Sequence, residues 1–111
     1  MLITAVTRPA TFEAIKEALA LFGVHGMTVG QVIRANPHGG QVQIYRGFKY
    51  CSDMQAGLRI ELLVPNDEVA DLMRVVNKIL ATSDPDGGCL WNTPVDLAVR
   101  VRTGEYGLDA L

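Results

Sequence analysis

Aromatic side chains and cysteines are scarce in this sequence. Phenylalanine, tyrosine and tryptophan make up 6% of the 111 residues, and the two cysteines, Cys51 and Cys89, stand far apart. They form no C-x-x-C pair and have no partner at zinc-site spacing, so we expect two reduced thiols in a cytoplasmic protein. No apolar stretch reaches about 18 residues without a charge, so we expect no membrane-spanning helix.

An excess of basic residues is also missing. Ten lysine and arginine residues stand against twelve aspartate and glutamate residues, which gives a formal net charge of -2. Nucleic-acid-binding domains normally carry the opposite balance, so the composition argues against DNA or RNA as a partner. The sequence contains no Ser-His-Asp, paired-carboxylate or metal-hydrolase motif. Asp84 and Asp86 stand in a turn with proline and glycine, where aspartate commonly serves turn formation, so we predict no enzyme.

Apolar residues, by contrast, are abundant. They make up 49% of the chain, and 111 residues are enough for one domain with an adequate core. A high aliphatic content with few aromatics indicates strands and helices rather than disorder. The apolar content also exceeds what a monomer of this size needs, so we expect part of the apolar surface to be covered by another molecule.

The first half of the chain predicts a strand, a helix and a second strand. Leu2–Thr7 is a short apolar run without a basic leader, so we expect a strand rather than a signal peptide. Apolar residues then recur at helical spacing over 12–22. Thr11 is predicted to cap this helix and Gly23 to end it. A second strand is predicted over 27–35.

The second half repeats this order. Residues 58–64 alternate in part between apolar and polar side chains, which predicts a strand. Asn66–Glu68 supplies a helix cap and acidic side chains for the first helical turn. A stripe of apolar residues over 69–80 predicts the second helix. After a glycine-containing turn at 84–88, the alternation over 95–102 predicts the last strand.

The predicted order β-α-β-β-α-β is the split βαβ, or ferredoxin-like, pattern of an α+β domain. In this fold an antiparallel sheet carries both helices on one face, and its other face is bare. Four apolar residues lie on strands that contribute to both faces: Val29, Ile60, Leu62 and Val99. Burial of the bare face against further copies, in a closed cyclic oligomer, would account for the surplus of apolar residues.

A long insertion, residues 36–57, separates the two middle strands. A tight hairpin could make this connection, and loops of about 20 residues within a compact domain are commonly functional. Aromatic and basic residues suited to contact with a partner gather there: Tyr45, Arg46, Phe48, Lys49 and Tyr50. The same segment also allows a β-hairpin arm that extends the sheet, so both interpretations stay open.

Four pieces of sequence follow one another along the chain: Gly26-Met27-Thr28-Val29, Tyr45-Arg46-Gly47-Phe48-Lys49-Tyr50, Val64-Pro65-Asn66-Asp67 and Arg100-Val101-Arg102-Thr103-Gly104-Glu105. In this order they resemble the PII nitrogen-regulatory signal proteins, and the similarity runs from end to end. The resemblance implies one ferredoxin-like domain over 1–111, a homotrimer, adenine nucleotides bound between subunits, and a long flexible docking loop at 36–57. It also implies a non-catalytic regulator in nitrogen control.

The resemblance implies these nucleotide-binding residues: Thr28, Glu61, Val64, Asp86, Gly87, Gly88, Arg100 and Arg102. Arg100 and Arg102 are two apart on the predicted last strand, so their side chains would point the same way and clamp a polyphosphate. The glycine turn would hold phosphate oxygens with backbone amides.

The long loop carries the residues that the resemblance implies for output. Tyr45 and Arg46 match positions of partner docking, and Tyr50 matches a tyrosine that is nucleotidylated in many family members. The implied target is a membrane transporter or a metabolic enzyme, with no insertion of this chain into the membrane. Docking residues are therefore better retained than the residues that bind effectors.

The sequence departs from the family pattern at several effector positions. Cys89 replaces a phosphate-binding lysine, and the glycine pair expected at Arg34 and Asn36 is missing. Loss of one cation removes a charge-assisted hydrogen bond of about 1.5–3 kcal/mol. We therefore expect weak ATP binding, or a preference for ADP or AMP, with Mg²⁺ as an accompanying ion and no obligatory cofactor. His38 and Gly57 replace the glutamine and lysine of the 2-oxoglutarate site, which argues against that metabolite.

Two other functions stay open. A divergent PII-like regulator of bicarbonate, cation or metal transport would keep the docking loop without the 2-oxoglutarate residues. A small trimeric metal-binding protein of similar architecture would draw on the soft ligands His38, Cys51 and Cys89, although their spacing matches no motif. For His38 alone, an exposed loop histidine is the simpler interpretation.

Overall fold

The structure, a computed structural model, describes residues 1–24, 26–35, 42–45, 48–51, 54–84 and 88–111. The helices and strands within these ranges are β1 (Leu2–Thr7), α1 (Phe12–Leu21), β2 (Thr28–Ala35), β3 (Val42–Tyr45), β4 (Phe48–Cys51), β5 (Met54–Leu63), α2 (Val69–Ser83) and β6 (Cys89–Thr93). Three short 3₁₀ turns accompany them: η1 (Pro9–Thr11), η2 (Asn66–Glu68) and η3 (Gly107–Ala110).

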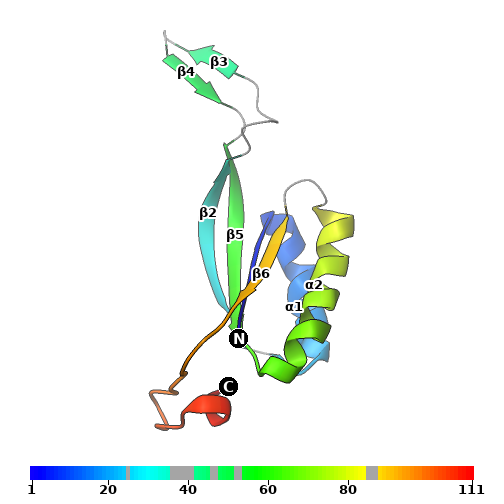
Figure 1. The fold of residues 1–111 in the computed structure, drawn as a ribbon. Helices are drawn as coiled ribbons and strands as arrows, with labels where there is room; N and C mark the ends of the chain where they lie inside the picture. The colour runs from blue at the N-terminus through cyan, green and yellow to red at the C-terminus, as the bar shows by residue number, and fades with distance from the viewer. Residues whose placement is uncertain (25, 36–41, 46–47, 52–53, 85–87) are drawn as a thin grey trace.

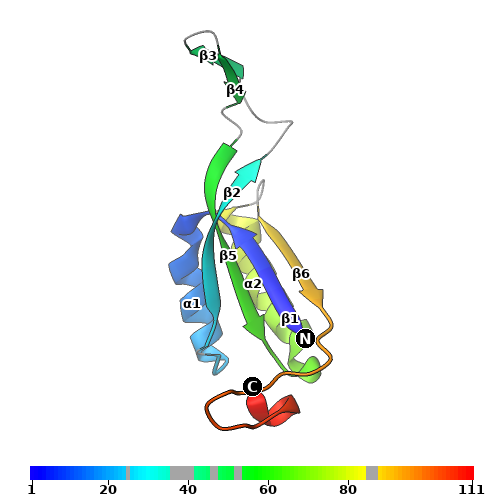
Figure 2. The ribbon, with the colours of Figure 1, turned by 90° about the vertical axis from the view of Figure 1, so that its left-hand side faces the viewer.

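Four strands form one antiparallel sheet in the order β2-β5-β1-β6. The first strand of the chain is therefore central, and β5 lies between the parallel pair β1 and β2. Both helices cover the same face of this sheet, and the other face is left open (Figures 1 and 2). This arrangement confirms the predicted α+β ferredoxin-like fold.

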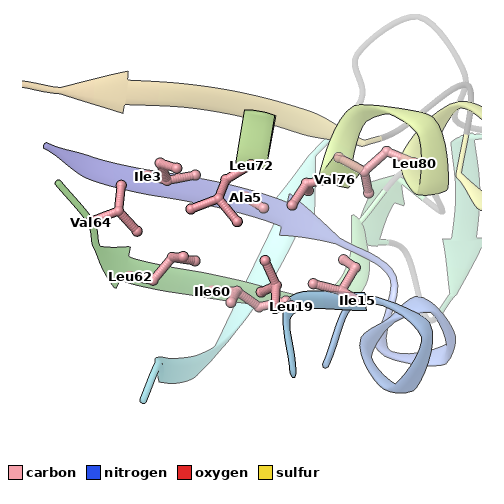
Figure 3. Packing of buried hydrophobic residues seen from close by; sticks show 10 residues of the cluster. All are labelled: Ile3, Ala5, Ile15, Leu19, Ile60, Leu62, Val64, Leu72, Val76 and Leu80. Atoms are coloured by element: carbon pink, nitrogen blue, oxygen red, sulfur yellow. The ribbon is translucent and has the colours of Figure 1, made fainter. Parts of the chain in front are cut away.

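The core lies between the sheet and the two helices. Alternate residues of β1 and β5 face the helices, and apolar residues three or four apart on α1 and α2 meet them. Figure 3 shows the ten buried residues that make up this cluster: Ile3, Ala5, Ile15, Leu19, Ile60, Leu62, Val64, Leu72, Val76 and Leu80. None of the helices in the described parts of the chain is long and apolar enough to cross a membrane.

The helix boundaries agree with the sequence, but the predicted caps differ. Gly23 follows α1 with a φ of 82°, the left-handed conformation that favours glycine at a helix end. Thr11 holds the N-cap position of α1, yet its side chain makes no capping bond, because η1 leads directly into the helix and the Phe12 amide bonds to the Pro9 carbonyl. Asn66 does not cap α2 either, since its Oδ1 accepts a bond of 3.2 Å from the Met1 ammonium group.

The last strand lies earlier than the sequence predicts. β6 is Cys89–Thr93, and residues 95–102 do not join the sheet. Pro94 follows β6 and lacks the amide that a continuing ladder needs. Downstream, a single bridge joins Val99 to Tyr106, and Gly104 closes a turn with a φ of 77°. The alternating apolar residues of 95–102 are exposed, because no strand in the part of the chain that the structure describes covers them.

The strands β2 and β5 continue beyond the sheet as a two-stranded ribbon. β1 pairs with β5 only from Leu58 to Leu63, whereas β2 pairs with β5 as far as Met54. Residues 54–57, which the sequence assigned to the long loop, therefore belong to a strand. Beyond the ribbon, β3 and β4 pair with each other in a separate two-stranded sheet (Figure 1). The interpretation as an arm that extends the sheet is therefore correct in the strand pairing but wrong in the extension, because β3 and β4 do not join the main sheet.

Candidate functional site

A cleft of about 820 Å³ lies at the end of the sheet farthest from the β3–β4 hairpin. It is bounded by the end of α1, the start of β2, the end of β5 and the C-terminal segment. Four residues that the sequence singles out line it together: Thr28, Glu61, Val64 and Arg100. Positions spread over more than 70 residues of sequence thus meet at one place in the fold.

Thr28 and Glu61 come from adjacent strands. They are register partners in the β2–β5 ladder, on the face away from the helices. The Glu61 carboxylate accepts a bond from Arg59 Nε at 2.5 Å, and the Arg59 guanidinium lies 5.7 Å from the centre of the Trp91 ring. The Arg59 contacts hold the carboxylate in place, since a guanidinium stacked on an indole loses little freedom when it binds an anion.

Val64 follows the end of β5, and both of its backbone groups bond to Met1. Its amide donates to the Met1 carbonyl at 3.0 Å, and its carbonyl accepts from the Met1 ammonium group at 3.1 Å. Its side chain is buried in the core. Val64 therefore fixes the wall of the cleft, and its own backbone groups are engaged by Met1.

Arg100 enters the cleft from the C-terminal segment. Its Nη2 donates to the Ala110 carbonyl at 3.1 Å, so η3 positions the guanidinium. Arg102 lies in the turn over 101–103 and is not among the residues that line the cleft. The prediction that Arg100 and Arg102 point the same way along a strand is wrong, because the chain turns directly after Arg100, where the Gly104 amide bonds to the Arg100 carbonyl at 2.7 Å.

Gly88 lies at the opposite end of the sheet from the cleft. It precedes Cys89, which pairs with Val6, whereas Leu63 at the cleft pairs with Leu2. Four residues of strand correspond to about 13 Å. The Gly88 amide donates to the Asp84 carbonyl at 2.9 Å, and a Cβ at position 88 would meet that carbonyl oxygen at 3.0 Å. Asp86 and Gly87, the other predicted residues of this turn, lie outside the described residues.

A buried ion pair beside this turn was missed by the sequence interpretation. Asp84 is 6% exposed, and its Oδ2 accepts from Arg34 Nη1 at 2.9 Å, from the Arg8 amide at 3.1 Å and from Thr7 Oγ1 at 3.3 Å. The sequence interpretation gave Asp84 a role in turn formation alone. The one available signal was Arg34 itself, a long cation where the family pattern has glycine.

The remaining predicted residues fall in or next to the long loop. Tyr45 and Tyr50 lie on β3 and β4, in register with Phe48 and Gln43 respectively, while Arg46 and His38 lie outside the described residues.

Cys89 is an exposed free thiol. The described residues contain no group of three or more His, Cys, Asp or Glu side chains placed to hold a metal ion.

Sequence comparison places these features in one family. Residues 1–105 match the family model described as Nitrogen regulatory protein P-II. The chain is 36% identical to Nitrogen regulatory protein P-II 1 and to Nitrogen regulatory protein P-II 2, both of Methanothermobacter thermautotrophicus, over 98% of this chain and 95% of each relative. It is 32% identical to Nitrogen regulatory protein P-II of Cereibacter sphaeroides, over 98% of this chain and 97% of that relative. The chain therefore belongs to the PII family of nitrogen regulatory proteins.

Proposed function

We propose that this chain is a non-catalytic regulator that assembles as a homotrimer, binds adenine nucleotides between its subunits and controls a target protein in nitrogen regulation through its long loop. The observation that carries the proposal is the cleft in which Thr28, Glu61 and Arg100 meet. A hydroxyl, a carboxylate and a guanidinium around an apolar wall can recognise a ribose, a base and a phosphate respectively.

The predicted site residues lie at opposite ends of the sheet, and this separation supports nucleotide binding between subunits. Gly88 lies about 13 Å or more from the cleft along β1. A second copy that brings its own Gly88 turn to the cleft would complete the site.

Two exposed apolar surfaces support the assembly itself. The open face of the sheet carries Leu63, which is 44% exposed, beside half-buried Leu2 and Val6. The C-terminal segment exposes Leu97 at 62% and Val101 at 94%. Apolar areas of this kind on a small domain are typical of subunit contacts, and closed cyclic oligomers bury them on every copy.

The choice of effector separates the leading proposal from a second candidate. Gly57 and Cys89 stand where the family pattern has lysines, which favours ADP or AMP and disfavours 2-oxoglutarate. The same departures favour a regulator of bicarbonate, cation or metal transport as the second candidate. In either case the long loop is the output segment, and the target is a transporter or an enzyme.

Calorimetry and sedimentation together test the proposal. Wild-type protein is titrated with AMP, ADP and ATP at a fixed Mg²⁺ concentration, and its mass is measured by sedimentation equilibrium. We expect a trimer that binds nucleotide, and about tenfold weaker ATP binding in Arg100→Gln, because one charge-assisted hydrogen bond is removed. Arg74→Gln is the matched control, since Arg74 is exposed on α2 and pairs only with Asp71. A monomer, or a chain that binds no adenine nucleotide, would contradict the proposal.

A thermal-shift screen then distinguishes the two candidates. Ligands that bind the native state raise its apparent melting temperature. A shift with ADP or AMP supports nitrogen-type nucleotide regulation, whereas a shift with bicarbonate or with a divalent cation alone supports the second candidate.

A further inference from the structure

The ion pair between Arg34 and Asp84 joins two segments that are 50 positions apart in the sequence. Arg34 lies near the end of β2, where the chain leaves for the long loop, and Asp84 ends α2 and begins the turn that closes at Gly88. The Arg34 side chain is 14% exposed and that of Asp84 is 7% exposed. The contact is therefore a defined part of the fold rather than a surface encounter.

The charged side chains around Asp84 carry more positive than negative charge. Two guanidinium groups flank one carboxylate: Arg34 Nη1 lies 2.9 Å from Oδ2, and Arg8 Nε lies 3.7 Å from Oδ1. Thr7 Oγ1 and the Arg8 amide also donate to Oδ2. Asp84 Oδ2 therefore keeps two hydrogen bonds without Arg34, and the two arginines and Asp84 together carry one net positive charge.

Gly57 is what allows Arg34 to reach Asp84. The Arg34 side chain passes directly over Gly57, so that a Cβ there would lie 2.5 Å from Arg34 Cδ and 2.9 Å from Cγ. A lysine at position 57 would exclude Arg34 from this path. Arg34 therefore occupies the space into which a side chain at position 57 would begin to extend.

We propose that Arg34 is the specificity-determining residue for the number of phosphates at the nucleotide site, and that Asp84 competes with the phosphates for it. The inference rests on the proposed function, which brings the phosphate end of the nucleotide to the turn closed by Asp84 and Gly88. A further phosphate binds Arg34 only if Arg34 leaves Asp84, so the gain from each added phosphate is reduced by the lost ion pair. The preference for ATP over AMP is consequently smaller than an unpaired Arg34 would give.

The test compares the ratio of ATP affinity to AMP affinity among variants of the full chain. Calorimetry is carried out with both nucleotides at one Mg²⁺ concentration. We expect Asp84→Asn to raise the ratio about tenfold, because Arg34 is released to the phosphates, and Arg34→Gln to lower it by a similar factor. Arg34→Lys keeps the charge without the planar fork and should lie between wild type and Arg34→Gln. The control Arg74→Gln should leave the ratio unchanged.

AMP binding separates the inference from the function on which it rests. If AMP binds and the ratio is the same in wild type, Asp84→Asn and Arg34→Gln, the role of Arg34 is overturned and the nucleotide site stands. If wild type binds neither AMP nor ATP, both are overturned. Circular dichroism confirms that each variant is folded. Should Asp84→Asn unfold, the two Arg34 variants decide the question, because they leave Asp84 with its bonds from Thr7 and Arg8.

Discussion

Thr28 and Glu61 lie directly opposite each other in the β2–β5 ladder, although they are 33 positions apart in the sequence. Side chains at paired positions of an antiparallel ladder project from the same face with their Cβ atoms about 5 Å apart. The hydroxyl and the carboxylate therefore present themselves together at the mouth of the cleft. A ligand group that hydrogen-bonds to both must itself offer a donor, as a ribose hydroxyl or an exocyclic amine does.

Thr28→Ala should weaken AMP binding about tenfold or less. The substitution removes one neutral hydrogen bond, and Thr28 is exposed, so the fold does not depend on it. The matched control is Thr82→Ala, whose hydroxyl bonds only to carbonyls of its own helix. Calorimetry with AMP measures both. Equal AMP affinity in Thr28→Ala and wild type would show that Thr28 does not contact the nucleotide.

Two buried threonines should respond to valine in opposite directions. Thr7 Oγ1 donates to the buried Asp84 carboxylate, so Thr7→Val should lower the free energy of unfolding by about 1–3 kcal/mol. Thr11 Oγ1 is buried and has no hydrogen-bond partner among the described residues, so Thr11→Val should raise the free energy of unfolding by about 1 kcal/mol. Urea denaturation at one protein concentration measures both changes. A loss of stability in Thr11→Val would mean that its hydroxyl does find a partner.

Gly57→Ala should destabilise the protein mainly through Arg34. The added Cβ would lie 2.5 Å from Arg34 Cδ and would push the guanidinium away from Asp84, at a cost of about 1–3 kcal/mol. In an Arg34→Ala background the same glycine substitution should cost much less. A double-mutant cycle by urea denaturation should give a coupling energy of about 1 kcal/mol or more. Additive effects would show that the two side-chain positions do not compete for space.

Val6→Glu should dissociate the proposed assembly while leaving the chain folded. Val6 lies on β1, the central strand next to β5, and projects from the open face of the sheet. A carboxylate there would be buried in the proposed subunit interface, and the arginine opposite it on β5, Arg59, already binds Glu61. Leu21→Glu is the control, because Leu21 is 89% exposed on α1, on the other side of the molecule. Sedimentation equilibrium should show a lower mass for Val6→Glu alone. An unchanged mass in both variants would place the interface elsewhere.

The fold could be predicted from the sequence because its signals are local. The period-two burial of Ile3 and Ala5, and the four-residue spacing of Leu72, Val76 and Leu80, reflect contacts that every strand and helix of this type makes. The order of elements then leaves few topologies. The ends of α1 and α2 were also predicted closely, since Gly23 marks the first and the apolar stripe the second.

The position of the last strand could not be predicted in this way. Alternation over 95–102 indicates that alternate residues meet apolar surroundings, but it does not say in which chain those surroundings lie. The shorter segment Cys89–Thr93 forms the strand because it follows α2 at the edge of β1, and Pro94 prevents its extension. Of the candidate site, the cleft residues were predicted from resemblance to a family.

The Arg34–Asp84 pair could not be predicted from local sequence patterns or from the family resemblance. No local pattern links residues 50 positions apart, and the resemblance indicates glycine at position 34. Only the path across Gly57 brings them together, and that path depends on the register of β2 and β5.

The ribbon formed by β2 and β5 has a consequence for how this protein can change over time. From Val32–Gly57 to Ala35–Met54 its strands pair only with each other within the main sheet, and β3 pairs only with β4. Insertions, deletions and substitutions between positions 36 and 53 therefore replace none of the ten core residues. Selection for a new partner and selection for a stable fold act on separate stretches of the chain, so one scaffold can acquire new targets without first becoming less stable.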